Sequence, residues 1–146
     1  MEKEPVTIRL MSIQDYASVY KLWTETAGMA IRSYDDSEEG IAKFIAKNPN
    51  SNFVAIKDGE IIGVILCGID GRRAYIYHTV VNPAYRRQGV GKLLLEAVMK
   101  VAEAEGIHKS GLLVMRNNEL GQQFWISQGW DIRNDVVYYS YNNVPQ

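Results

Sequence analysis

One short segment of the chain, residues 82–92, gathers two glycines, two arginines and a lysine. It reads Asn-Pro-Ala-Tyr-Arg-Arg-Gln-Gly-Val-Gly-Lys, and Gly89 and Gly91 stand where a strongly amphipathic stretch begins. A helix that starts on glycines has unpaired backbone N–H groups at an electropositive end, and no Cβ atom keeps a ligand away from them. The basic side chains add positive charge at the same place. The segment therefore predicts an anion site that suits a phosphate or a pyrophosphate.

Spacing excludes two common phosphate-binding loops. A Walker A loop requires Gly-x-x-x-x-Gly-Lys-Ser/Thr, whereas this segment has Gly-x-Gly-Lys-Leu. The dinucleotide fingerprint requires a third glycine three residues after Gly91, where Leu94 stands. What remains is Arg86-x-x-Gly89-x-Gly91, directly after the apolar run that ends Val-Val-Asn-Pro. The simpler interpretation is a solvated basic turn ahead of a helix.

The elements that position this segment follow from the spacing of apolar residues. Alternating apolar residues predict strands, and apolar residues at i, i+3, i+4 and i+7 predict amphipathic helices. The expected strands are residues 6–10, 52–56, 61–69, 74–81, 110–115 and 136–141. The expected helices run from the Ser12 cap to Gly28, from the Ser37 cap to Asn48, over 90–102 with Gly106 as its end, and over 120–127.

The order of these elements, β-α-α-β-β-β-α-β-α-β, indicates a mixed α/β fold. Turn signals at Asp58-Gly59 and Asp70-Gly71 predict that the three middle strands form an antiparallel meander. The long helix over 90–102 connects one strand to another by a crossover, and such a connection favours a parallel pair. We therefore expect a mostly antiparallel sheet with one parallel pair of strands.

Composition sets the broad class of protein. The 146 residues carry 16 Lys and Arg against 17 Asp and Glu, a formal net charge of -1, which argues against a general nucleic-acid binder. No apolar run is long enough to span a bilayer, and the first residues lack the pattern of a signal peptide. The single cysteine calls for no oxidising compartment. We expect one domain over residues 1–146, soluble, cytoplasmic and not membrane-bound.

At this point the sequence resembles the GCN5-related N-acetyltransferase (GNAT) family. The family motif is (Gln/Arg)-x-x-Gly-x-(Gly/Ala), entered from a strand that ends in Val-x-Pro, and residues 81–91 match it. A second segment, from Asn118 through Trp125 to Gly129-Trp130, is similar to the family's Asn…Phe-Tyr…Gly-Phe segment. The resemblance covers essentially the whole chain, and it implies the twisted, mostly antiparallel sheet of that family.

The resemblance implies acetyl-CoA as the acyl donor. The pyrophosphate would lie on the backbone amides of residues 87–92, and the pantetheine arm would pair with the backbone of residues 80–82 like an added strand. A primary amine would attack the thioester directly, and a backbone N–H near Val81 would hold the oxyanion. The residues implied in donor binding are Val80, Val81, Asn82, Arg86, Arg87, Gln88, Gly89, Val90, Gly91, Lys92, Asn118, Phe124 and Trp125.

The catalytic acid and base are not evident. An alkylamine of pKa ~10.4 is about 99.9% protonated at neutral pH, so a base is needed. Relatives that acylate protein N-termini carry a glutamate at the position of Leu113, and many members carry a tyrosine as general acid at the position of Trp125. A thiol of pKa ~8.5 is a tolerable leaving group without that acid. The loss of the glutamate disfavours acetylation of protein N-termini.

The candidates for the base are Tyr75, Tyr77 and Glu25. Relatives place their base at positions that match Tyr75 or Tyr77, and strand alternation puts both on one face of the 74–81 strand and His78 on the other. For His78 we favour ordinary packing. Both tyrosines also fit ordinary packing aromatics. Glu25, with Asp35 and Asp36, lies near the connection between the first two helices, which in this family covers the acceptor site.

Three functions stay open, with the transferase favoured. The acceptor is a small-molecule amine or, less favoured, a protein amine. The alternatives are a non-catalytic acyl-CoA-binding or sensing domain and a protein-interaction module with a vestigial loop. Cys67 is an alternative acyl carrier, although no basic neighbour is visible, and one cysteine with two histidines gives no metal-ligand spacing. Exposed aromatics such as Tyr138, Tyr139 and Tyr141 favour a homodimer.

Overall fold

A five-stranded sheet forms the centre of the unit made by residues Met1–Leu113. The computed structural model describes residues 5–26 and 34–144. The strands follow the order β1 (Thr7–Leu10), β2 (Phe53–Lys57), β3 (Glu60–Ile69), β4 (Arg73–Val81) and β5 (Lys109–Leu112). The first four are antiparallel neighbours, and β4 and β5 are parallel. This mixed sheet with one parallel pair confirms the predicted fold class.

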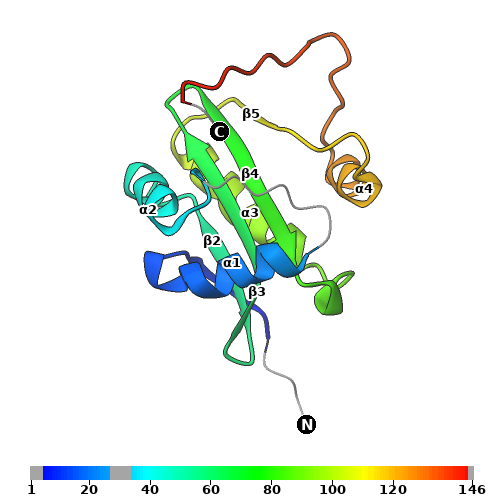
Figure 1. Ribbon diagram of the computed structural model, residues 1–146. Coiled ribbons are helices and arrows are strands. Elements are labelled where there is room, and N and C mark those ends of the chain that lie inside the picture. The colour runs from blue at the N-terminus through cyan, green and yellow to red at the C-terminus, as the bar shows by residue number, and fades with distance from the viewer. Residues whose placement is uncertain (1–4, 27–33, 145–146) are drawn as a thin grey trace. The chain divides into compact units, whose positions relative to one another are not determined.

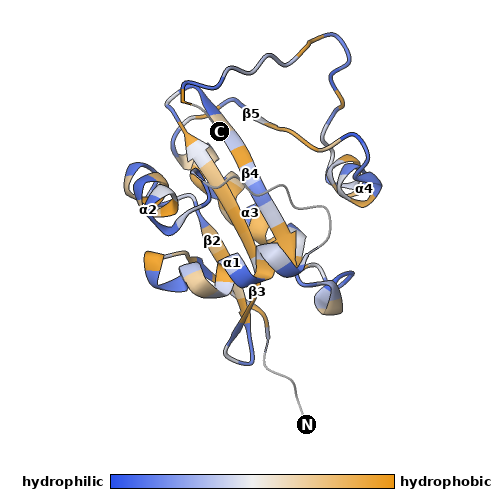
Figure 2. Cartoon of the chain, in the orientation of Figure 1, coloured by the Kyte–Doolittle hydropathy of each residue, from blue (hydrophilic) through white to orange (hydrophobic). Residues whose placement is uncertain are grey.

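Helices cover both faces of this sheet (Figure 1). On one face lie α1 (Tyr16–Glu25), which follows a 3-10 turn at Ile13–Asp15, and α2 (Glu38–Lys47). On the other face lies α3 (Val90–Ala104), whose Leu94 and Val90 pack closely over Gly63 of β3. Figure 2 shows why the layers form: the middle strands are largely hydrophobic, and the helices are hydrophobic on one side only.

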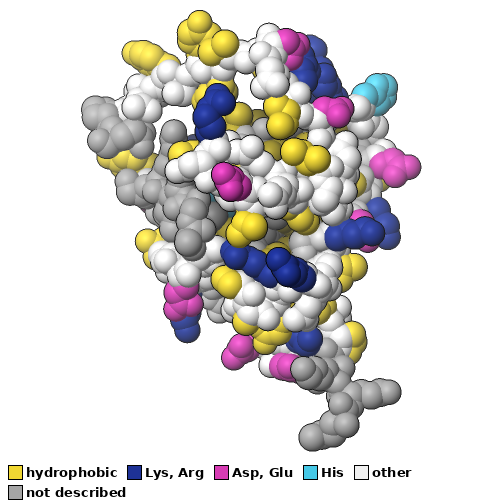
Figure 3. Space-filling view, turned by 90° about the vertical axis from the view of Figure 1, so that its right-hand side faces the viewer, with side chains coloured by type: hydrophobic (Ala, Val, Ile, Leu, Met, Phe, Trp, Pro, Cys, Tyr) yellow, Lys and Arg dark blue, Asp and Glu magenta, His cyan; other side chains and the backbone are white. Residues whose placement is uncertain are grey.

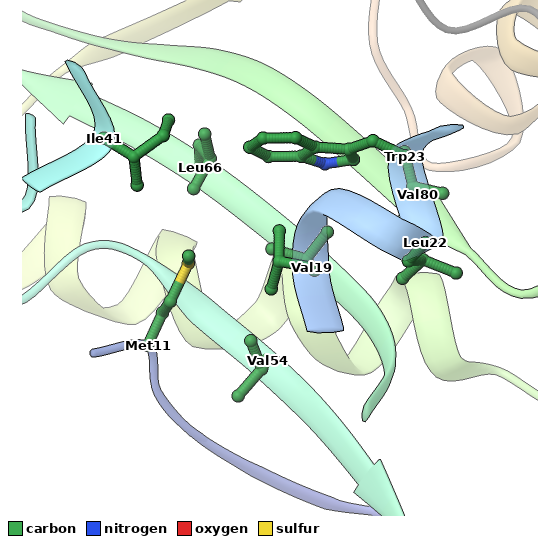
Figure 4. Packing of buried hydrophobic residues seen from close by; sticks show 9 residues of the cluster. Met11, Val19, Leu22, Trp23, Ile41, Val54, Leu66 and Val80 are labelled. Carbon is green, nitrogen blue, oxygen red and sulfur yellow. The ribbon is translucent and has the colours of Figure 1, made fainter. Parts of the chain in front are cut away.

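The core beneath α1 is built from aliphatic side chains around one tryptophan. Trp23 and Val19 are fully buried and lie against Leu66 and Val80 of the sheet (Figure 4). Burying side chains of this size stabilises the fold by about 1.5–3 kcal/mol each before entropy is subtracted. The helix is thereby fixed against the two central strands.

Turns and caps agree with local sequence signals. Asp58 and Gly59 have φ of 51° and 78°, the two left-handed residues of a tight hairpin. At the end of α3, Gly106 has φ of 73°, and Ile107 donates its N–H to the carbonyl of Ala102 at 2.9 Å. This is the helix ending that a glycine at this place predicts. The predicted helix stop at Gly28 lies outside the described residues, and α1 ends at Glu25.

A β-bulge interrupts the regular alternation of β4. On β3, only Leu66 lies between the residue paired with Thr79 and the residue paired with Ile76. On β4, both Tyr77 and His78 lie in that interval. Two residues of one strand therefore oppose one residue of the other, which turns both side chains to the same face of the sheet.

The bulge corrects the predicted position of His78. The ring of Tyr77 lies 5.4 Å from that of Phe44 in α2, and the ring of His78 lies 4.9 Å from that of Trp23 in α1. Both side chains thus face the helices of the same layer. The prediction that His78 and Tyr77 lie on opposite faces was wrong, because alternation fails across an inserted residue.

The second unit, Val114–Gln146, contains α4 (Glu119–Ser127) and a long irregular segment. Asn118 caps the helix, since its Oδ1 accepts the N–H of Gly121 at 2.9 Å. At the other end Gly129 has φ of 89°, Trp130 donates its N–H to the carbonyl of Trp125 at 3.0 Å, and the two indole rings lie 5.1 Å apart. These contacts make up a Schellman ending with its usual apolar contact. They explain the Gly-Trp pair as a helix stop.

Two predicted strands differ from the structure. The strand expected at 110–115 is β5, which ends at Leu112. The strand expected at 136–141 is absent, because within the described part of the chain no strand pairs with this segment. Its side chains are exposed, up to 89% for Tyr139. Apolar alternation alone makes no strand without a partner for the backbone.

No helix in the described ranges is long and apolar enough to cross a membrane.

Candidate functional site

The sheet has an open edge where β4 runs on beyond β5. The two strands pair only from Arg73 to Ile76 of β4, so in the described chain residues 77–81 have no strand partner on that side (Figure 1). On the other side, Asn82 donates its N–H to the carbonyl of Ile62 at 2.8 Å. Successive residues of a strand point their backbone groups to opposite sides. The N–H and C=O of Val81 therefore face the open edge.

Of the three backbone positions expected to pair with a donor, Val81 alone turns both its groups outward. By strand alternation, the backbone N–H and C=O of Val80 point toward β3, where its paired residue is Val64. Asn82 uses its N–H on β3 and its carbonyl oxygen on the N–H of Tyr85 at 2.8 Å. By the same alternation Thr79 joins Val81 at the open edge. An extended ligand would therefore pair with residues 79 and 81.

The loop after β4 is built to expose backbone N–H groups. The Asn82 side chain accepts the N–H of Ala84 at 2.9 Å and starts a short turn at Pro83–Tyr85. Arg87 and Gly89 follow with φ of 64° and 79°, a left-handed conformation that is unusual for an arginine. Alternating conformations of this kind make backbone concavities that bind anions.

The N-terminus of α3 continues this row of donors. The first bond of the helix runs from the N–H of Leu93 to the carbonyl of Gly89 at 3.0 Å. The N–H groups of Val90, Gly91 and Lys92 precede that bond, so they have no acceptor within the helix. The cap residue Gly89 offers no side chain to them. Together with the helix dipole, this end of α3 favours a negatively charged group.

Positive side chains surround the same backbone. Arg86, Arg87 and Lys92 are exposed, as is Gln88, and none of the ion pairs among the described residues involves them. The ammonium of Lys57 lies over the ring of Tyr85, 5.6 Å from its centre. On the face drawn in Figure 3, Lys and Arg side chains occur in small groups among acidic and hydrophobic ones. These basic side chains make a local positive patch on a chain whose net charge is close to zero, and such a patch favours the binding of a small anion.

On the face covered by α1 and α2, a histidine is paired with a carboxylate. Nε2 of His78 lies 2.8 Å from Oδ1 of Asp36, which is only 6% exposed. The hydroxyl of Tyr16 donates to the backbone carbonyl of Asp36 at 2.7 Å. The loop carrying Asp36 also packs onto α2 at Gly40, where a Cβ atom would come within 2.5 Å of the Tyr34 carbonyl oxygen. The backbone that carries Asp36 is thus held from two sides.

Sequence reasoning missed this pair. Asp36 was grouped with the acidic residues of the helix connection, and His78 was assigned to the wrong face. The two residues are 42 positions apart, so no local pattern joins them. The pair depends on the β-bulge, and the alternation of apolar residues in the sequence does not reveal that bulge.

The residues predicted as base candidates lie at different places. Tyr77 is half exposed, and its ring lies 4.8 Å from that of Tyr75, so the two tyrosines and Phe44 form one aromatic surface. This surface is adjacent in the strand to His78. Glu25 is exposed at the last residue of α1. The structure therefore brings both tyrosines together and leaves Glu25 in solvent.

Cys67 is unsuited to carry an acyl group. Its side chain is fully buried in β3, and burial raises the pKa of its thiol to about 12. The reactive form of cysteine is the thiolate, which is scarce near neutral pH at such a pKa. A reaction through an acyl-cysteine is therefore excluded on these grounds.

The remaining predicted donor residues lie in the second unit. Trp125 is only 9% exposed, and its ring packs 5.0 Å from that of Phe124 on one side and against Trp130 on the other. Asn118 uses its side-chain oxygen as the cap of α4 and keeps its amide N–H groups for other partners. The structure brings these residues together through α4.

Comparison with known proteins identifies the family. Residues 16–130 match the Acetyltransferase (GNAT) family. An acetyltransferase of Sodalis glossinidius (strain morsitans) is 31% identical over 130 residues, which cover 89% of this chain and 90% of that protein.

Solved structures share the fold. The PaiA N-acetyltransferase from Thermoplasma acidophilum, in complex with coenzyme A, superposes with a TM-score of 0.79 at 24% identity, covering 89% of this chain and 92% of that one. An aminoglycoside acetyltransferase from an uncultured soil metagenomic sample has a TM-score of 0.72 at 21% identity, over 94% and 95% of the two chains. With the strand, the loop and the helix terminus in place, the chain belongs to the GNAT family of acetyltransferases.

Proposed function

We propose that this protein transfers the acetyl group of acetyl-CoA to a primary amine of a small molecule. The observation that carries the proposal is two sets of outward backbone donors on one strand–loop–helix segment. The first is the N–H of Val81 on the open edge of β4, and the second is the N–H groups of residues 90–92 at the start of α3. A thioester on an extended arm that leads to a pyrophosphate is the ligand that matches this arrangement.

In this proposal each stretch of backbone holds one part of the donor. The amides of residues 87–92 and the side chains of Arg86, Arg87 and Lys92 hold the pyrophosphate. The pantetheine arm lies along β4, beside residues 79 and 81. The thioester oxygen then accepts the N–H of Val81, which stabilises the negative charge that develops on this oxygen. Asn118, Phe124 and Trp125 contribute to the binding of the arm.

The transfer proceeds by direct attack. The ammonium first gives one proton to a base. The lone pair of the neutral amine then forms a bond to the thioester carbon, the carbon–sulfur bond breaks, and coenzyme A leaves as its thiolate. The second proton, which the acylated nitrogen loses, goes to this thiolate. The burial of Cys67 supports a direct reaction over one through an acyl-enzyme.

For the acceptor we propose a small, cationic amine. The aromatic surface of Tyr75, Tyr77 and Phe44 offers ring faces to a cation, and Asp36 and Glu25 add negative charge in the same layer. The shared fold with an aminoglycoside acetyltransferase is compatible with such an acceptor.

We further propose that residues 1–146 work as one N-acetyltransferase domain. The family match at residues 16–130 runs through both compact units, which supports this view. The exposed tyrosines at 138, 139 and 141 suit a homodimer contact, which light scattering on the purified protein tests. A monomer at all concentrations would remove the dimer from the proposal.

The experiment that tests the function has two stages. Calorimetric titration with acetyl-CoA, with NAD and ATP as controls, should show selective binding. Thiol release is then followed with a panel of primary amines. Selective binding without thiol release above background would instead support a sensing domain, for which Trp125, in the place of the usual acidic tyrosine, is the favouring observation. Failure to bind any CoA species would overturn the proposal.

A further inference from the structure

We infer that His78 takes the proton from the acceptor amine and that the carboxylate of Asp36 positions its ring for this task. The inference rests on the proposed acetyl transfer and names the base that the transfer requires. It stands on three observations: the contact between the two side chains, the burial of Asp36, and the β-bulge that turns His78 toward the helices α1 and α2.

The contact between the side chains decides which ring nitrogen is basic. In a neutral imidazole one nitrogen donates and the other accepts, and an ionised carboxylate can only accept. Since Nε2 of His78 lies 2.8 Å from Oδ1 of Asp36, this nitrogen carries the hydrogen. The lone pair is then on Nδ1, which has no hydrogen-bond partner among the described residues. The His78 side chain keeps 21% of its surface exposed, so this lone pair is within reach of a ligand or a water.

The surroundings hold the ring in this orientation. Trp23 packs against it edge to face at 4.9 Å. Asp36 is buried, and the hydroxyl of Tyr16 fixes its backbone. When the ring accepts a proton, the carboxylate at 2.8 Å stabilises the positive charge. An imidazole held in this way can accept a proton without turning its ring.

The position along β4 fits the reaction. His78 lies three residues before Val81, which at ~3.3 Å per residue separates their Cα atoms by about 10 Å. An imidazole, a bridging water and the attacking nitrogen span such a distance. The proton would pass from the ammonium to Nδ1, directly or through the water, while the nitrogen bonds to the thioester carbon beside Val81. The same bulge places the aromatic surface around Tyr77 next to His78.

The earlier candidates suit this task less well. A tyrosine must first lose its own proton to act as a base, which is unfavourable at neutral pH. Glu25 is exposed at the last residue of α1. His78 alone combines an oriented lone pair with a buried partner. The competing explanation is that His78 merely packs against Trp23, so a test has to separate packing from proton transfer.

The experiment compares two acceptors whose ammonium groups differ in acidity. One is a primary alkylamine that the wild type acetylates, and the other is its fluorinated counterpart, which is largely neutral at pH 7. The variants are His78→Gln and the isosteric Asp36→Asn. His108→Gln is the matched control, because His108 is the chain's other histidine and is exposed just before β5, beside the start of β4 and not beside its end at Val81. All variants are first checked for a cooperative melt and for acetyl-CoA affinity.

We expect His78→Gln to lower kcat/KM for the alkylamine by about 10²–10³-fold, within the range for general base catalysis. The fluorinated amine needs no base, so its loss should be less than about tenfold. Asp36→Asn should show a smaller loss, which is again greater for the alkylamine than for the fluorinated amine. The reason is that a neutral partner allows the hydrogen to sit on Nδ1 of His78. His108→Gln should match the wild type on both amines.

Three results would overturn parts of this account, and they can be told apart. Equal losses on both amines would show that His78 only supports the structure. No loss in either variant would remove the pair from the reaction. A wild type that acetylates neither amine would refute the proposed transfer and the inference with it. If His78→Gln fails to melt cooperatively, Asp36→Asn decides by the same comparison of amines.

Discussion

Replacing Gly91 with glutamate should stabilise the protein and, at the same time, weaken donor binding by about tenfold or more. Gly91 is the second residue of α3, and its φ lies outside the left-handed region, so a side chain fits the backbone. Its N–H precedes the first hydrogen bond of the helix. A carboxylate here satisfies the helix end in the absence of ligand, and it repels a pyrophosphate that approaches the same N–H groups.

The substitution should raise the stability of the ligand-free protein and lower its affinity for the donor, and each effect has its own size. In the absence of ligand, replacing glycine raises the free energy of unfolding by roughly 0.5 kcal/mol through helix propensity, and a negative charge in the first turn raises it by about 0.3–1 kcal/mol. A total of about 1 kcal/mol should raise Tm by roughly 3 °C for a chain of this length. With ligand, a charge ~6 Å from each phosphate charge costs about 0.7–2.8 kcal/mol at an effective dielectric constant of 80 to 20. Two phosphate charges together weaken binding by about tenfold or more.

Gly91→Gln is the matched control, because it adds nearly the same bulk without the charge. Thermal melts of the three ligand-free proteins give the stability change, and calorimetric titration with acetyl-CoA gives the affinity. We expect Gly91→Glu to melt above the wild type and to bind at least about tenfold more weakly than Gly91→Gln. Affinities of the two variants within twofold of one another would refute the placement of the pyrophosphate at α3.

Three further predictions concern other parts of the chain. Asp15 accepts two hydrogen bonds of 2.8 Å from Arg9, which lower the pKa of its carboxyl group, so Asp15→Asn should cost about 1–2 kcal/mol at pH 7. That cost should shrink as pH falls from ~4 through the lowered pKa of Asp15, where the folded wild type also loses the charge, and a cost in urea unfolding that does not vary with pH would contradict it. The buried thiol of Cys67 should react with a thiol reagent only in denaturant, and fast labelling of the native protein would show that it is accessible. Trp125→Phe should keep turnover within about tenfold, since an indole supplies no catalytic proton; a loss of several orders of magnitude at unchanged binding would disprove this.

Much of the fold could be predicted because its signals are local. The hairpin at Asp58-Gly59 needs only two residues that tolerate a left-handed backbone, and the end of α3 at Gly106 needs only one. The amphipathic stripe of α3 likewise specifies its own buried face. The start of α3 at Val90, directly after Gly89, follows from the same local rules.

What could not be predicted depends on residues far apart in the chain. Whether the segment at 136–141 forms a strand depends on a pairing partner, which its own alternation does not supply. The face of His78 depends on how β4 pairs with β3, where one residue opposes two. The contact of His78 with Asp36 depends in turn on that face. A single inserted residue therefore reverses the predicted face of every side chain that follows it in β4.

The bulge also explains how one strand can serve both reactants. A regular strand presents its side chains on two faces and its backbone groups on two edges, so the aromatic surface at Tyr77 and the base at His78 would lie on opposite sides of the sheet. With two residues opposite Leu66, both side chains face α1 and α2, while the N–H of Val81 keeps its outward direction at the open edge. The strand then offers an acceptor surface, a proton acceptor and an oxyanion donor within five residues.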